Sequence, residues 1–106
     1  MVRRLTVAAV TNDALATEEI RRVEVPSVVN MWAATDDEGD TLGLLLNKTE
    51  IMPTGRVNLE IGTGVVDTSR DQCVFDEVVG AGQLRVPATV VTTLTEFILS
   101  VRPILG

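Results

Sequence analysis

The sequence predicts a single, mainly β domain: an antiparallel β-sandwich, a jelly-roll-like fold or a small barrel, with about seven or eight short strands and at most one short helix. Valine occurs 17 times and threonine 13 times among 106 residues, and β-branched side chains suit a pleated surface better than a helix. Several segments alternate polar and apolar residues between turn residues, which is the period of a strand. The length, residues 1–106, indicates one domain.

The N-terminal third contains three expected strands separated by one ambiguous segment. Residues 3–10 and 28–34 are predicted strands, and residues 22–25 alternate until proline 26 interrupts the pattern, because proline has no N–H for a ladder. Residues 11–22 leave two alternatives open, a loop or a short helix capped by Asn12 or Asp13.

The fold is expected to be organised around residues 41–61, TLGLLLNKTEIMPTGRVNLEI. The leucine-rich run at 42–46 fits a strand covered on both faces. Residues 47–48 could be a turn or a bulge. The sequence of residues 53–55, PTG, predicts that the chain reverses there, because proline and glycine suit successive turn positions.

The strand expected at residues 56–61 has the clearest alternation in the chain. Val57, Leu59 and Ile61 should share one face of it, and Glu60 should point the other way.

The C-terminal half is expected to contain further strands at residues 65–66, 72–79 and 83–86, with a turn at residues 80–82. Residues 88–102 are ambiguous, because some apolar positions have helical spacing whereas most residues there are β-branched. A long strand ended by Pro103 is favoured over a helix.

The charge balance argues against nucleic acid and membrane partners. The formal net charge is −6, with one lysine and eight arginines, and aromatic residues make up 3% of the chain. A nucleic-acid surface needs clustered cations and stacking side chains, and an anionic membrane also attracts cations. No apolar run approaches the roughly 20 residues of a spanning helix. The apolar segment after Arg4 ends too soon for a signal peptide, so the chain is expected to remain in a cytosol.

Catalytic and cofactor chemistry has few candidates here. The chain has no histidine and one cysteine, Cys73, which excludes Ser-His-Asp and Cys-His sites and a structural zinc centre. Cys73 is expected to be a small buried hydrophobe rather than a reactive thiol. Nothing in the sequence brings Glu60 and Glu77 together for acid–base work. We therefore expect no catalytic residues, no cofactor and no enzyme activity.

Two acidic loops are the candidates for a cation site. The first holds Asp36, Asp37, Glu38 and Asp40, and the second spans residues 67–71. Carboxylate oxygens suit calcium, but the first loop lacks the closing glutamate of an EF-hand, since Asn47 stands in that position. The favoured interpretation of both loops is solvated surface, and no metal is expected.

The apolar content predicts self-association. Hydrophobic residues make up 45% of the chain and the mean hydropathy is +0.27, which is more than a small domain easily buries alone. The expected homo-oligomer interface is the leucine strand, with tryptophan as an anchor: Leu42, Leu44, Leu45, Leu46 and Trp32.

These observations favour a non-enzymatic structural subunit that assembles with copies of itself and with other shell proteins. A small virion component, such as a capsid, coat or capsid-decoration protein, is the expected class, located in the virion and assembled in the host cytoplasm. The acidic charge places it away from packaged nucleic acid. The alternative is a cytoplasmic β-sandwich binding or adaptor module for a small ligand or peptide.

Overall fold

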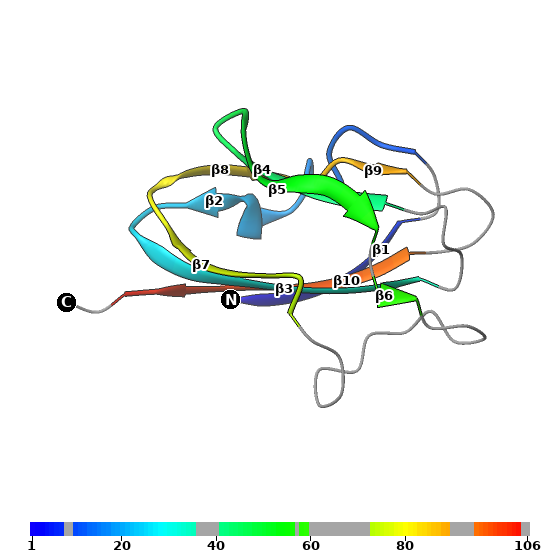
Figure 1. Ribbon diagram of the computed structural model, residues 1–106. Helices are drawn as coiled ribbons and strands as arrows, with labels where there is room; N and C mark the ends of the chain where they lie inside the picture. Colours follow the sequence, from blue (N-terminus) through cyan, green and yellow to red (C-terminus); the bar gives the residue numbers. More distant parts are fainter. Residues whose placement is uncertain (8–9, 36–40, 57, 60–72, 90–94, 105–106) are drawn as a thin grey trace.

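Two β-sheets lie face to face as a sandwich in the computed structural model, which describes residues 1–7, 10–35, 41–56, 58–59, 73–89 and 95–104 (Figure 1). Each sheet has five strands. The Cα radius of gyration is 13.0 Å, the value expected for about 100 residues packed as one domain. The predicted mainly β, antiparallel sandwich is confirmed.

Sheet A has β10 and β3 at its centre. β1 pairs with the outer side of β10, while β7 and β6 both pair with the side of β3 that faces away from β10. All pairs are antiparallel except β3–β6, which is parallel. The strands are β1 (Val2–Val7), β3 (Ser27–Thr35), β6 (Asn58–Leu59), β7 (Phe75–Val79) and β10 (Thr95–Pro103).

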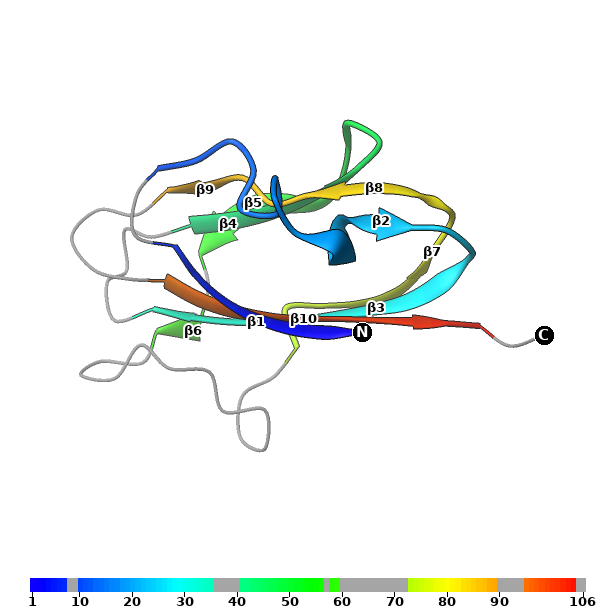
Figure 2. The same cartoon turned by 180° about the vertical axis from the view of Figure 1, so that it is seen from behind.

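Sheet B has the order β2–β8–β4–β5, and β9 also pairs with β4. Its pairs are all antiparallel. The strands are β2 (Arg22–Val23), β4 (Thr41–Leu46), β5 (Thr49–Arg56), β8 (Gly82–Arg85) and β9 (Ala88–Thr89). β5 and β7 lie toward the viewer in Figure 1, and β1 and β2 lie toward the viewer in Figure 2.

The core fills the space between the sheets and follows from the alternation of the central strands. Alternate residues of β3 and β10 point inward, so Met31, Phe97 and Leu99 have no exposed surface. From the opposite sheet, Leu44 and Leu84 are equally buried. Burial of such side chains contributes about 1.5–3 kcal/mol each, and this contribution holds the two sheets together.

The chain reverses between β4 and β5 at Asn47 and Lys48, whose φ angles are 51° and 71°. Positive φ at two successive residues is what a tight type I′ hairpin requires. The turn predicted at residues 53–55 was therefore wrong, because β5 continues through them. Pro53 is tolerated since β5 is an edge strand with a register shift at this point.

Residues 11–22 form turns and the short 3₁₀-helix η1 (Glu19–Arg21) rather than the capped α-helix considered above. Asp13 caps one of these turns: its Oδ1 accepts hydrogen bonds from the backbone N–H of Leu15, at 2.9 Å, and of Val86, at 3.2 Å. The side chain thus ties this segment to the end of β8. In the part of the chain described, no helix has the length and apolar character needed to cross a membrane.

The described parts of residues 88–102 are strand rather than helix, as favoured, but they are not one long strand: β9 pairs with β4 in sheet B, whereas β10 lies in sheet A. The predicted strand at residues 56–61 is represented by β6. Several other predictions fall outside the described residues and stay predictions: the faces of Val57 and Ile61, the position of Glu60, the strand at 65–66, and the acidic loops at 36–40 and 67–71.

Candidate assembly surfaces

The leucine run predicted as an interface divides between the core and the surface. Leu42 and Leu44, 1% and 0% exposed, belong to the core of their own chain. Leu46 packs partly against that core. Leu45 is half-buried on β4, where it pairs with the exposed residues Glu50 and Arg85. Folding of one subunit thus accounts for most of the run, and a half-buried leucine between charged neighbours is ordinary protein surface.

Trp32 lies on the other sheet. It is half-buried on the face of sheet A that points away from sheet B, where it packs against Ala34 and Ile98. These three residues form a small apolar cluster separate from the main core. Trp32 is therefore not brought together with the leucine strand, and the two parts of the predicted interface lie on opposite sides of the sandwich.

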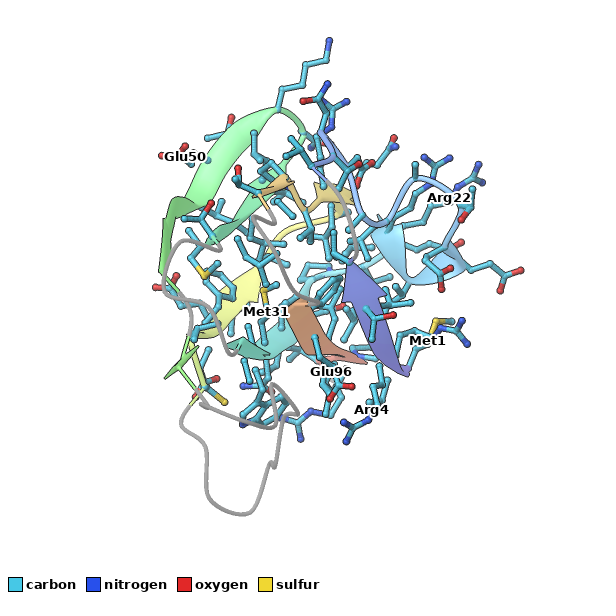
Figure 3. All side chains as sticks on the ribbon, turned by 90° about the vertical axis from the view of Figure 1, so that its right-hand side faces the viewer. Met1, Arg4, Arg22, Met31, Glu50 and Glu96 are labelled. Atoms are coloured by element: carbon cyan, nitrogen blue, oxygen red, sulfur yellow. The ribbon has the colours of Figure 1, made fainter. Side chains whose placement is uncertain are left out.

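On the same outer face of sheet A, polar side chains of neighbouring strands form hydrogen bonds and an ion pair with one another. Asn30 donates a hydrogen bond from Nδ2 to Oδ1 of Asp76, at 2.6 Å, and accepts one at its own Oδ1 from Arg102, at 3.2 Å. Arg4 of β1 forms an ion pair with Glu96 of β10. Figure 3 shows Arg4 and Glu96 on this outer face, with Met31 between the sheets. Asn30 and Glu96 are largely buried. Their hydrogen bonds and ion pair avoid the free-energy cost of burying a polar group without a partner.

The outer edge of β1 can be assigned from its hydrogen bonds to β10. Met1 and Val101 exchange backbone hydrogen bonds, of 2.8 and 2.9 Å. Hydrogen-bonded pairs alternate along an antiparallel ladder, so Arg3, Leu5 and Val7 also direct their backbone groups toward β10. The N–H and C=O groups of Val2, Arg4 and Thr6 therefore point away from β10.

The outer edge of β7 follows in the same way. The carbonyl of Met31 accepts a hydrogen bond from Val74 N, at 2.8 Å, so the backbone groups of Met31 face β7. Since Met31 lies opposite Phe75, alternation directs Phe75, Glu77 and Val79 toward β3. The backbone groups of Asp76 and Val78 then point away from the sheet. Of the strands described, none pairs with the outer side of β1 or of β7.

These two edges carry opposite charge and matching exposed valines. β1 has the sequence VRRLTV, and both arginine side chains are 51% exposed although each has a carboxylate partner, Glu18 in the case of Arg3. β7 has the sequence FDEVV, with both carboxylate residues exposed. Val2 and Val78 are each 61% exposed. One edge of sheet A is basic and the other is acidic.

Both edge strands of sheet B are less suited to pairing with another chain. β2 has two residues, and β5 contains Pro53 at a register shift. Short strands, proline and bulges are the features by which sheet edges avoid pairing with another chain. β1 and β7 have six and five residues and contain no proline, so the feature that opposes their pairing with a like edge is their charge.

A separate open groove of about 800 Å³ lies between η1, β2, the start of β3 and the end of β10, with Met1 at its side. Its lining is charged with both signs, including Glu19, Arg21, Arg22 and Glu24. A smaller groove of about 410 Å³ adjoins it along Val2 and Arg3. The groove has room for an extended peptide.

Few of the described side chains are placed for metal binding or catalysis. Among the described residues, no three His, Cys, Asp or Glu side chains are close enough to hold a metal ion. Glu77 is exposed on β7, and Cys73 is half-buried just before it. Burial raises the pKa of the Cys73 thiol above its ordinary value, and the nearby Asp76 carboxylate raises it further, so the thiolate is scarce near neutral pH.

Comparison of the chain with protein-family models, with curated proteins and with solved structures found no match.

Proposed function

We propose that the protein is a non-enzymatic structural subunit that assembles with copies of itself into a shell, as a small capsid, coat or capsid-decoration protein of a virion does. The observation that carries this proposal is the pair of edge strands of sheet A, β1 and β7, which carry opposite charges and contain no proline. Exposed edges are templates for pairing with another chain, and edges of opposite charge favour a partner that carries both, which a second copy does.

The composition supports the shell role in two ways. The net charge of −6 suits a position away from packaged nucleic acid, and the lack of histidine removes most catalytic arrangements. In this role the partners are further copies and other shell proteins, and the site of assembly is the host cytoplasm.

The test is the oligomeric state of the full chain. Size exclusion with light scattering at high micromolar concentration should give a mass of several subunits, and negative-stain electron microscopy should show rings, filaments or closed particles. A monomer across that concentration range would contradict the proposal.

The alternative function, a binding or adaptor module, draws on the open groove between η1, β2, the start of β3 and the end of β10. Its mixed charges would suit an extended peptide with charges of both signs. This reading predicts a monomer or dimer whose melting temperature rises with peptides of that kind. Large assemblies with no such rise would count against it.

A further inference from the structure

We propose that sheet A continues from one subunit into the next, with β1 of one copy pairing antiparallel with β7 of its neighbour and Val2 lying opposite Val78. This inference rests on the proposed self-assembly and names the contact that drives it. Within one chain β1 and β7 already run antiparallel, because each strand step from β1 through β10 and β3 to β7 is antiparallel. A neighbour in the same orientation therefore presents β1 in the direction that β7 requires.

The register follows from matching side chains across this seam. With Val2 opposite Val78, Arg3 meets Glu77, Arg4 meets Asp76, and Leu5 meets Phe75. Two opposite-charge pairs then lie between two apolar pairs, and such cross-strand pairs are the unit of sheet stabilisation.

The backbone independently supports the same register. Val2 and Arg4 direct their N–H and C=O groups away from β10, and Asp76 and Val78 direct theirs away from β3. The register makes these residues face each other as hydrogen-bonded pairs. A slip by one residue would break both the hydrogen-bond alternation and the match of side-chain faces.

Side-chain faces also agree across the seam. Val2 and Arg4 lie on the outer face of sheet A, since they are opposite Ser100 and Ile98. Asp76 and Val78 lie on that same outer face, opposite Asn30 and Val28. Each pair therefore joins side chains on one side of the continued sheet.

The charges select this seam over the alternatives. Two β1 strands would bring four arginines together with no carboxylate contributed by either strand, and two β7 strands would bring four carboxylates together with no basic residue from either strand. Like charges across a sheet edge oppose pairing. The partners within the chain do not prevent the seam, because each guanidinium carries five donors and can serve two carboxylates. A contact between two different edges is heterologous, so it propagates into a ring or a filament.

Charge reversal tests the seam. Glu77→Arg alone and Arg3→Glu alone should each raise the concentration needed for assembly by about tenfold or more, equivalent to about 1.4 kcal/mol. An equimolar mixture of the two variants should assemble again, because every seam then pairs either two native or two reversed residues. The double variant should also recover.

The controls change the same charges away from the seam. Glu50→Arg and Arg85→Glu alter exposed residues of sheet B and should leave assembly unchanged. Equal assembly of Glu77→Arg, Arg3→Glu and wild type would overturn the seam while self-assembly stands. Loss of assembly on Leu45→Asp alone would place the contact on sheet B and also overturn it. A monomeric wild type would instead remove the proposed function itself.

Disulfide trapping tests the register directly. Cα atoms of a hydrogen-bonded antiparallel pair are about 5.5 Å apart, within the range of a disulfide. Val2→Cys combined with Val78→Cys, in a Cys73→Ser background, should give a ladder of dimers, trimers and longer chains on a non-reducing gel. Each single cysteine variant should stay monomeric on that gel. Dimers from Val2→Cys alone, or no ladder from the double variant, would overturn the register.

Discussion

Asn47 is the residue on which the β4–β5 hairpin depends most. It adopts a φ of 51° at the turn, and its Oδ1 accepts a hydrogen bond of 2.9 Å from the backbone N–H of Gln83. Its backbone N–H donates to the carbonyl of Gln83 at 2.9 Å. The side chain occupies the space beside Gly82, where an added Cβ would lie 2.5 Å from Nδ2. The hairpin tip is thus fastened to β8 beside Gly82, where the absence of a side chain leaves room for the Asn47 amide.

Gly82→Ala should therefore destabilise the fold. The methyl group displaces the Asn47 side chain and breaks its hydrogen bond to Gln83, which costs about 1–2 kcal/mol. The matched control is Gly80→Ala, because an added Cβ there meets nothing within 4 Å. Urea unfolding at one protein concentration measures the difference. Equal midpoints for the two variants would show that the Asn47 contact contributes nothing.

Cys73 should react slowly with alkylating reagents at neutral pH. Burial and the Asp76 carboxylate both raise the pKa of the thiol, so the thiolate that attacks the reagent forms only at higher pH. The rate of iodoacetamide labelling should begin to rise at a higher pH than it does for a cysteine in an unfolded peptide. Asp76→Asn should move that profile partly back toward lower pH, because burial, the larger cause, remains. An unchanged profile would remove Asp76 as a cause.

At the scale of the element, β4 shows how one strand divides its side chains between core and surface. Leu44 is 0% exposed and Leu45, its neighbour, is half-buried between Glu50 and Arg85. Leu44→Ala should lower the free energy of unfolding by about 2–5 kcal/mol. Leu45→Ala should lower it by well under half as much. Chemical denaturation of both variants compares them, and similar losses would mean that Leu45 also belongs to the core.

Sequence patterning predicted most strand positions because alternation and β-branching are local. Residues 28–34 and 83–86 lie within or largely within β3 and β8. The turn predicted at residues 53–55 was wrong because PTG is a strong local turn signal, whereas an edge strand with a bulge also accommodates proline. Neither Asn47 nor Lys48 is a glycine, so the sequence did not indicate that both would adopt positive φ values.

The assembly edges could not be found in the sequence for a different reason. The charges of VRRLTV and FDEVV are visible there, but which strands end a sheet is decided by pairings between distant segments, such as β1 with β10. The apolar surplus directed attention to the leucines, two of which the sandwich buries by itself. Identifying an edge requires the topology.

At the scale of the whole molecule, the proposed seam between β1 and β7 should make assembly sensitive to salt. A seam with two opposite-charge pairs at its centre weakens as the Debye length falls from about 10 Å at 0.1 M to about 3 Å at 1 M ionic strength. The assembled fraction measured by light scattering should therefore decrease with added sodium chloride. An assembled fraction that increases with salt would indicate a contact dominated by apolar burial.

Because β1 pairs with the central strand β10, β1 can form an edge of sheet A only after β10 has been translated. β10 lies between β1 and β3, and Val2 finds its place only opposite Ser100. Residues 2–7 are translated before residues 95–103, so β1 has no strand to pair with until β10 has been synthesised and has docked on β3. At about 5–20 residues per second this wait lasts several seconds. If β1 pairs with β7 of a neighbour as proposed, a nascent chain can offer its β1 edge only after residue 103 has been translated.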